Sequence, residues 1–586
     1  MTAGANRQPL RARWRGLALA ATIALAVLAC APPWAAGAVG GWAGAGIVQA
    51  PGGPDMTDAL GRRLELHGVN LVAKCGGGAQ ASTAPGTPCI GLAQGPKLAY
   101  VLSPEARDPG RRFTAADALT LARLGVNMVR LGIVWEGLEP GPVSVGPNDP
   151  RYCAAHRRGT PFPVLGRADP YDPATVRAYL ARTDRIVALL SGAGIRVVID
   201  MHQDVWGSAF SYAGGLTPWN GEGAPPWATC TGPLPLTLPS SWGSGYLVPA
   251  IQRSIHHFWA NDVRGDLQGQ FARVWQAVAS HYRDDPEVIG YDIFNEPNDY
   301  LTGHLDAELE CDYGGPVHEP RSCAVSHPAA LPDGLIGAIQ AADPSHVVLF
   351  EPSGSTDFGS PELIGIAEPL RFRNVALAFH VYGDPSTQLL QTHNELARTR
   401  TAQPGGPAWI MDEFGGTNVP GPTAGTVSLA GVANLSWAYW SAFQLDDPTG
   451  ANAFEGLLDQ RTRRPYPAVA QALAVPYPAA TAGTPGPEFF NRVTRTFRYS
   501  YAVDRQVQAP TEIELPSYTY PHGYTVRVTG AAVVSRRSAP VLELLAERRA
   551  GRVTLTVRAA GSRTALSPGA VPAATGRLRS GGRLPS

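Results

Sequence analysis

The stretch "VIGYDIFNEPNDY", Val288 to Tyr300, decides the fold. It opens as an apolar run, which is typical of a buried strand. It then leads directly into Asn295, Glu296 and Pro297. A carboxylate is costly in a core, because burial removes its hydration. The stretch therefore predicts a strand that leaves the core and delivers an amide and an acid to a cleft.

Seven more segments have this strand-like pattern, and helical segments separate most of them. The strand candidates are Leu64–Val72, Val126–Trp135, Ile195–His202, His346–Pro352, Asn374–Tyr382, Ala408–Gly416 and Leu435–Phe443. The helix candidates are Ala115–Gly125, Thr175–Gly194, Leu267–Tyr282, Leu331–Ala342, Leu389–Thr401 and Thr423–Asn434. Near-continuous apolar strands indicate burial on both faces, as in a parallel sheet. The alternation predicts an α/β fold, a (β/α)8 TIM barrel over residues 55–475. A doubly wound open sheet is the alternative, but we find neither a dinucleotide fingerprint nor a P-loop.

The pattern changes after the barrel. "PYPAATAGTPGPEFF", residues 476–490, is rich in Pro, Gly and Ala, which is typical of a linker. Beyond it, segments such as "YTVRVTGAAVV" and "RVTLTVRA" alternate with period two. They predict a C-terminal antiparallel β-sandwich over residues 487–560. We expect the Gly-, Pro- and Arg-bearing tail, residues 561–586, to be disordered.

The N-terminus has the pattern of an export signal over residues 1–38. Four arginines precede the apolar run Leu17–Ala29, which is shorter than the roughly 20 residues that span a bilayer. Small residues at Ala36-Gly37-Ala38 suggest cleavage. We therefore expect a secreted protein. An uncleaved anchor is one alternative, and lipidation of Cys30, giving a cell-surface lipoprotein, is another.

Six cysteines remain after the signal, an even number that suggests disulfides in an exported chain. The pairs close in sequence are Cys75–Cys89 and Cys311–Cys323, which leaves Cys153–Cys230. This is one of 15 possible connectivities. A zinc site is disfavoured because no Cys-x-x-Cys pair occurs.

The charge balance excludes some partners. Lys+Arg and Asp+Glu are equal at 48 each among 586 residues. Nucleic-acid binding needs a basic field, so we expect no nucleic-acid partner. The balance also gives no support for electrostatic recruitment to anionic membranes.

Polar and aromatic residues gather at the C-terminal ends of the predicted strands, where TIM barrels carry their catalytic groups. They are Arg130, Asp200, His202, Gln203, Asp204, Asn295, Glu296, Glu351, His380, Tyr382, Asp412, Glu413, Trp437 and Trp440. Each is a weak signal alone: Asn-Glu-Pro is commonly a strand-to-turn junction, and Arg130 could pair with Glu136 or Glu139. Their joint placement favours a site. Two carboxylates from opposed strands suit hydrolysis of a glycosidic bond.

The set Arg130, His202, Asn295, Glu296, His380, Tyr382, Glu413 and Trp440 resembles the active site of glycoside hydrolase family 5, whose members are retaining TIM-barrel enzymes. "IFNEP" and "MDEFGG" resemble that family's acid/base and nucleophile strands. The closer resemblance is to its endoglycoceramidases. It rests on "HGVNLVAK", "MVRLGIVWEGLEP", "VVIDMHQDVWG", "GEGAPPW" and "PTEIELP", and it spans Leu64 to Ala559.

The resemblance implies Glu296 as general acid/base and Glu413 as nucleophile, with no metal and no cofactor. It implies that Asn295 binds the sugar 2-hydroxyl and that Tyr382 orients Glu413. The remaining implied substrate-binding residues are Lys74, Arg130, His202, Asp204, His380 and Trp440. Among these, Arg130 keeps Glu413 ionised, and Trp440 stacks under the sugar, with Trp437 as the alternative.

By this resemblance we expect a secreted, monomeric hydrolase that cleaves the β-linkage between a glycan, or a single sugar, and ceramide in glycosphingolipids, with transient contact to a membrane or micelle. The loops at residues 140–168 and 207–249 leave the head group open. A β-glucosidase or β-glucanase is the alternative enzyme. An inactive carbohydrate- or lipid-binding protein, and a metal-dependent hydrolase using His202, Asp204 and His380, are alternatives of other classes.

Overall fold

The computed structural model describes most of the chain. The described ranges are 46–72, 113–142, 144–157, 159–210, 221–236, 245–297, 334–351, 372–382, 406–416, 420–443, 455–459 and 462–561. Several predictions fall outside these ranges: the signal over residues 1–38, Cys30, Lys74, the pairs Cys75–Cys89 and Cys311–Cys323, the helix Leu389–Thr401 and the tail from residue 562.

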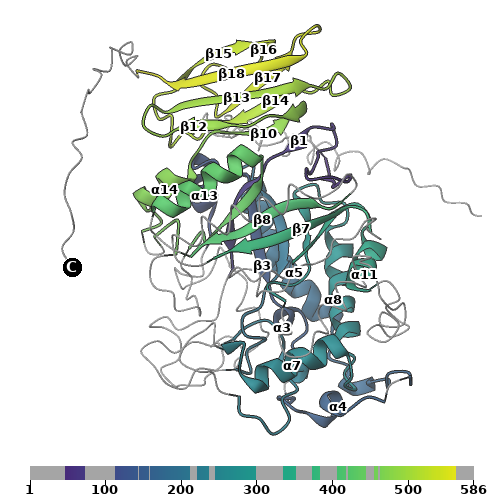
Figure 1. The fold of residues 1–586 in the computed structure, drawn as a ribbon. Coiled ribbons are helices and arrows are strands. Elements are labelled where there is room, and N and C mark those ends of the chain that lie inside the picture. The colour runs from purple at the N-terminus through teal and green to yellow at the C-terminus, as the bar shows by residue number, and fades with distance from the viewer. Residues whose placement is uncertain are drawn as a thin grey trace, which may run out of the picture.

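Eight parallel strands close into a barrel in which neighbours follow chain order (Figure 1). They are β2 (His67–Leu71), β3 (Met128–Ile133), β4 (Arg196–Met201), β5 (Val288–Asp292), β6 (Val347–Phe350), β7 (Val375–Val381), β8 (Ala408–Gly415) and β9 (Ser436–Trp440). β2 pairs with β9, which closes the ring. The predicted TIM barrel is thereby confirmed.

Helices surround the barrel, and some lie in the loops beyond its mouth (Figure 1). They are α2 (Ala115–Arg123), α3 (Trp135–Leu138), α4 (Pro150–Cys153), α5 (Pro173–Ser191), α7 (Pro249–Ala260), α8 (Leu267–Tyr282), α11 (Gly334–Ala342), α13 (Pro420–Ala433) and α14 (Pro467–Leu473), with the 3-10 turns η2 (Gly166–Ala168) and η3 (Pro226–Ala228). Their starts follow local chemistry. A capping box of Thr114 and Asp117 begins α2, and Asp172 caps α5 just before a proline.

The barrel interior has two levels. Small and branched apolar side chains fill the lower level, at the N-terminal ends of the strands; they include Met128, Val198, Ile289, Val347, Ala408 and Ala438. The preceding segment closes this end with Val48, Met56 and Leu66, among others. The upper level, at the C-terminal ends, is polar. The lower level therefore supplies packing and leaves the upper level free for chemistry.

The C-terminal domain consists of two antiparallel sheets, as predicted. One has the order β1 (Arg63–Leu64), β10 (Tyr477–Thr481), β14 (Thr511–Glu514), β17 (Val541–Ala546) and β16 (Ala531–Val533). The other has β11 (Gly483–Pro485), β13 (Thr496–Val503), β18 (Arg552–Ala559) and β15 (Tyr524–Thr529), with β12 (Phe489–Asn491) beside β13. Phe497, Tyr501, Leu544 and Val557 lie in the core of this domain.

The linker prediction for residues 476–490 is wrong, because this stretch contributes β10, β11 and the start of β12. Its prolines suggested a loop but are tolerated where they lie. Pro478 falls at the irregularity between Tyr477 and Ala480, and Pro485 ends the edge strand β11. The predicted strand Leu64–Val72 is also two strands, since Leu64 belongs to β1 in the sandwich and His67 begins β2 in the barrel.

The sandwich packs against the N-terminal end of the barrel, away from the polar level (Figure 1). The Tyr477 hydroxyl donates a hydrogen bond to the carbonyl oxygen of Gly125, just before β3, at 2.7 Å. The amide of Tyr518 donates to the carbonyl oxygen of Arg123 at the end of α2. Among the described residues, no helix is both long enough and apolar enough to cross a bilayer.

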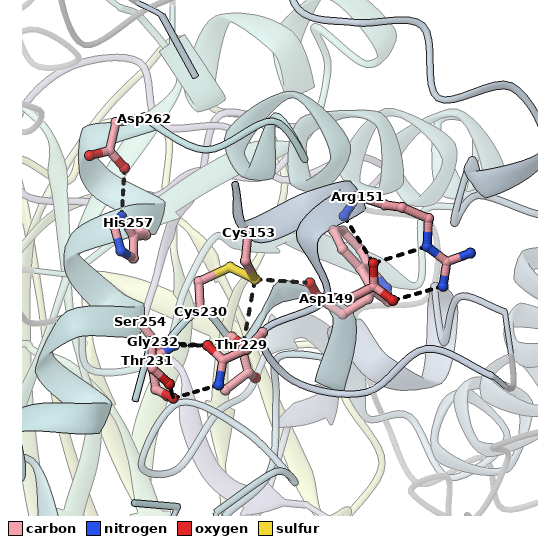
Figure 2. The surroundings of a disulfide bond; sticks show 12 residues. Asp149, Arg151, Cys153, Thr229, Cys230, Thr231, Gly232, Ser254, His257 and Asp262 are labelled. Carbon is pink, nitrogen blue, oxygen red and sulfur yellow. Dashed lines mark hydrogen bonds and ion pairs between the residues drawn. A yellow bond between two sulfur atoms is a disulfide. The ribbon is translucent and has the colours of Figure 1, made fainter. Parts of the chain in front are cut away.

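A disulfide between Cys153 and Cys230 confirms one of the three expected pairs (Figure 2). It ties the loop after β3 to the loop after β4 across a sequence separation of 77 residues. Asn148 reinforces the tie, because its side-chain oxygen accepts hydrogen bonds from the amides of Thr231 and Gly232, both at 2.7 Å. The loops that follow β3 and β4 are therefore held together covalently at the barrel mouth.

We predict that the double variant Cys153→Ala/Cys230→Ala lowers the free energy of unfolding by roughly 2–4 kcal/mol, because a closed loop of this length restricts the unfolded chain. Denaturant titration under non-reducing conditions, which keep the wild-type disulfide intact, measures it. Arg151→Ala, an exposed neighbour of the bridge, is the control and should change stability by less than about 0.5 kcal/mol. Equal midpoints for the double variant and the wild type would contradict the prediction.

Candidate active site

The Arg130 guanidinium occupies the centre of the polar level. It is fully buried, and its nitrogens lie within 3.2 Å of oxygens on five carboxylates. These belong to Asp200, Asp292, Glu351, Asp412 and Glu413. Burial acts to lower the pKa of Arg130, but the surrounding carboxylates outweigh it and raise that pKa well above its usual range. The residue therefore stays cationic and holds the C-terminal ends of four strands, β4, β5, β6 and β8, together around it.

Glu296 and Glu413 face each other across this level. One carboxylate oxygen of Glu296 lies within 4.8 Å of one on Glu413. His380 lies between them, with Nδ1 at 3.1 Å from Glu296 Oε1 and 3.5 Å from Glu413 Oε2. Retaining glycosidases hold their carboxyl groups about 5–5.5 Å apart, and inverting enzymes about 6.5–9.5 Å apart. The spacing matches a retaining site.

Asp412 and Glu413 are adjacent in sequence, yet both reach Arg130. Side chains on a regular strand alternate between faces, so one of them should point outward. A register shift between β7 and β8 removes the alternation: Ala378 pairs with Ile410, but His380 pairs with Glu413. This bulge turns both acids into the barrel.

Glu413 experiences opposing electrostatic effects. Burial raises its pKa, while His380 and Arg130 lower it; Glu296 raises it, and a hydrogen bond from Tyr382 lowers it. That hydrogen bond runs from the Tyr382 hydroxyl to Glu413 Oε2 at 2.7 Å. Arg130 is shared among five carboxylates, so it does not by itself keep Glu413 at a low pKa.

Glu296 is fixed through its backbone, which has a φ of +44°. A left-handed conformation is costly for a residue other than glycine, so neighbouring groups must hold it. The Glu296 amide donates to Glu351 Oε2 at 2.7 Å. Gln203 Nε2 donates to the carbonyl oxygens of Asn295 and Glu296, at 2.9 and 3.3 Å. The Asn-Glu-Pro turn is thus tied to the ends of β4 and β6.

A second group lies beside the glutamates. His202 Nδ1 is 2.8 Å from Asp200 Oδ2, and its Nε2 is 3.8 Å from Asp204 Oδ2. The His202 ring stacks on Trp440, with centroids 5.5 Å apart and planes at 10°. The Trp440 indole donates to Glu455 Oε2 at 3.2 Å. These residues form a wall with an aromatic face and carboxylates, a combination that suits a sugar ring and its hydroxyls.

The structure decides between several sequence alternatives. Trp437 does not reach this wall: its ring lies 4.3 Å from that of His67, at the other end of the barrel. Arg130 does not pair with Glu139, which instead accepts a hydrogen bond from the Trp135 indole at 2.8 Å.

The structure brings together nine of the ten predicted site residues; the tenth, Lys74, lies outside the described residues. The nine are Arg130, His202, Asp204, Asn295, Glu296, His380, Tyr382, Glu413 and Trp440. Further polar residues join them: Asp292, Gln203, Glu222, Glu351 and Glu455. Gln203 and Glu351 carried a sequence signal, since both follow strands. Asp292 could have been found as an acid inside an apolar run, but nothing near Glu455 marked it.

Three groups at the mouth have the composition of metal ligands, with donor atoms within 4.8 Å of one another: His202/Asp204/Glu222, Glu296/His380/Glu413 and Glu351/His380/Asp412. In the second and third groups, Arg130 already supplies positive charge to Glu413, Glu351 and Asp412. Three of the four carboxylates in these two groups therefore already have a cationic side chain beside them.

Comparison with known proteins agrees with this geometry. Residues 108–445 match the cellulase model of glycosyl hydrolase family 5, and residues 476–557 match the C-terminal domain of that family. Endoglycoceramidase I of Rhodococcus hoagii (strain 103S) is 26% identical over 537 residues, which are 88% of this chain and 89% of the relative. An endoglycoceramidase of Cyanea nozakii is 24% identical, over 81% of this chain and 85% of the relative.

Endo-glycoceramidase II from Rhodococcus sp. is a structural relative. Its lactosyl-enzyme intermediate is 26% identical, with a TM-score of 0.60, and the match covers 86% of this chain and 98% of that one. It has also been solved as a complex with ganglioside GM3. The family models cover the barrel and the sandwich, and their match shows that this chain is a glycosidase of glycoside hydrolase family 5.

Proposed function

We propose that this enzyme is an endoglycoceramidase, which hydrolyses the β-glycosidic bond between a glycan and ceramide with retention of configuration. The observation that carries the proposal is the approach of the buried Glu296 and Glu413 to within 4.8 Å of each other at the barrel mouth. The related endoglycoceramidases, which include a lactosyl-enzyme intermediate, support the same chemistry and the glycosphingolipid class of substrate.

In the first step, Glu413 attacks the anomeric carbon, and Glu296 donates its proton to the glycosidic oxygen. Ceramide leaves with that proton, and the sugar remains as an ester on Glu413. In the second step, Glu296 takes a proton from water, which attacks the same carbon and restores free Glu413. Both steps use the short separation, because the nucleophile must reach the carbon directly.

The neighbouring residues have roles that follow from their contacts. Tyr382 and Arg130 donate to opposite oxygens of Glu413, which fixes the carboxylate for attack. His380 bridges the two glutamates. Asn295 binds the 2-hydroxyl of the sugar at the cut. Trp440 stacks under that sugar. His202 and Asp204 form hydrogen bonds with its hydroxyl groups.

The setting of the enzyme is part of the proposal. We infer secretion from the N-terminal signal pattern, and a monomer that touches lipid only transiently. The sandwich packs at the opposite end of the barrel from Glu296 and Glu413, which supports lipid contact through the mouth loops and not through the sandwich.

Product analysis tests the substrate class. We expect lactosylceramide or a ganglioside to yield an intact glycan and ceramide, with the β-anomer of the glycan appearing first. The panel includes galactosylceramide, glucosylceramide and soluble cellotriose. Faster turnover of cellotriose than of every glycolipid would favour the alternative, a β-glucanase or β-glucosidase.

Substitution of the two glutamates should separate their roles. Glu413→Gln should lower kcat by at least about 10⁴-fold on every substrate, because no nucleophile remains. Glu296→Gln should lower kcat on lactosylceramide by a similar factor. It should spare the first step on an aryl lactoside, whose leaving group needs no proton, so that the glycosyl-enzyme accumulates and mass spectrometry detects it.

The control for both variants is Glu139→Gln. Glu139 is also buried, and burial raises its pKa well above the usual range, so the amide replaces a protonated acid. The activity of Glu139→Gln should match that of the wild type. Equal loss on both substrates by Glu296→Gln, without accumulation, would exclude the acid/base role.

Tyr382→Phe should move the acid limb of the kcat/KM profile to higher pH. The Tyr382 hydrogen bond lowers the pKa of Glu413, so its loss raises that pKa. Since attack requires ionised Glu413, activity then begins at a higher pH. Tyr291→Phe is the matched control, because it removes a tyrosine–carboxylate hydrogen bond, to Asp343 at 2.6 Å, away from the mouth. An unmoved acid limb in Tyr382→Phe would contradict the assignment.

A further inference from the structure

A second pair of buried glutamates lies at the opposite end of the barrel from the active site. Glu65 lies between β1 and β2, and Glu488 immediately precedes β12 of the sandwich. Their side chains and His67 each place one polar atom within 4.8 Å of the others. Glu65, Glu488 and His67 are 2%, 8% and 2% exposed. The pair therefore lies between the N-terminal end of the barrel and the C-terminal domain, out of contact with bulk water.

The surroundings hold this cluster rigidly. The His67 ring stacks on Tyr477 of β10, with centroids 3.5 Å apart, and its Nε2 is 2.8 Å from Glu65 Oε1. Asn434, just after α13, lowers the pKa of Glu65, and its Nδ2 donates a hydrogen bond to the carbonyl oxygen of Gly486 at 3.2 Å. The Glu488 carboxyl packs against α13, since a Cβ at Gly431 would lie 2.1 Å from its Oε1.

Within the described ranges, no Lys or Arg side chain forms an ion pair with either acid. Besides His67, the titratable groups that interact with the pair in the described part of the chain are Asp55, Tyr477 and Tyr499. Burial lowers the pKa of His67 well below its usual range, so the ring is neutral. One oxygen on each glutamate, Oε2, is buried without a hydrogen-bond partner among the described residues. Two ionised carboxylates in such a site would repel each other strongly.

A proton satisfies this geometry better than a metal ion. Atoms that bind one tetrahedral zinc at about 2.0–2.1 Å lie roughly 3.3 Å apart. The Glu65 Oε1–His67 Nε2 distance of 2.8 Å is shorter and is that of a hydrogen bond. The neutral His67 ring is therefore hydrogen-bonded directly to Glu65, which leaves no room for a cation between these two atoms.

We propose that Glu65 and Glu488, both protonated, form a latch between the C-terminal domain and the barrel, so that this interface loosens as the first of the two protons is lost in alkaline solution. The direction follows from burial, which raises the pKa of Glu65 well above its usual range and that of Glu488 to about 8. An acid whose pKa rises on folding stabilises the fold fully below its unfolded pKa of about 4.3, and this stability is lost as pH rises through the folded pKa. The latch is therefore closed in mild acid and open above about pH 8.

Thermal unfolding of the full chain between about pH 6 and about pH 9 tests the latch. Glu488→Gln replaces the protonated acid by a permanent amide donor, so its Tm should fall by roughly 5 °C less than that of wild type over this range. At the alkaline end it should be the more stable protein. Glu547→Gln, an exposed acid of the same domain, is the control and should follow wild type. Other buried acids contribute equally to all three proteins.

Two measurements keep the proposal testable if Glu488→Gln does not fold. Glu65→Gln should flatten the pH dependence in the same way. Isotope-edited infrared spectra of the wild type should show a protonated carboxylic acid band that weakens near pH 8, and this change should be missing in Glu488→Gln. Parallel Tm curves for Glu488→Gln and wild type would overturn the proposal. So would a rise in wild-type Tm on adding zinc that Glu488→Gln lacks, because a cation would then occupy the cluster.

Discussion

The buried guanidinium of Arg130 is the interaction on which the barrel mouth depends. Five carboxyl groups surround it, each with an oxygen within 3.2 Å of a guanidinium nitrogen. Removing one partner of a buried ion pair commonly costs about 3–5 kcal/mol, because the other charge is left uncompensated. Here one cation serves both architecture and chemistry: it fixes the ends of several strands and contacts Glu413.

Because the barrel is divided into an apolar and a polar level, the fold stays stable despite the charged groups at its mouth. Packing at the N-terminal level is independent of the mouth, and the sandwich seals that level from outside. The polar level can then hold strained and charged features, such as the left-handed backbone of Glu296 and the bulge at Asp412 and Glu413. Functional sites commonly carry such features where the surrounding fold is rigid.

Much of this was predictable from the sequence, because strand ends can be read directly. The apolar runs predicted all eight barrel strands, and the residues that follow them predicted most of the mouth. The side of each strand from which a given side chain projects was harder to predict. Strict alternation would have placed Asp412 and Glu413 on opposite sides, and only the pairing of His380 with Glu413 shows the bulge. For Trp437 and Trp440, alternation was informative: the small Ala438 lies inside the barrel, which places Trp440 inside and Trp437 outside.

The domain boundary was the least predictable feature. Proline and glycine in residues 476–490 are typical of a linker. The backbone nevertheless pairs there, because proline is tolerated in edge strands and at bulges. Because β1 precedes the barrel in the chain and pairs with β10 after it, the barrel is, in topology, an insertion into the sandwich. Cutting the chain after residue 475 would thus not release an intact catalytic module. It would strip β1 of its neighbour and uncover the plug of Val48, Met56 and Leu66 that closes the barrel floor.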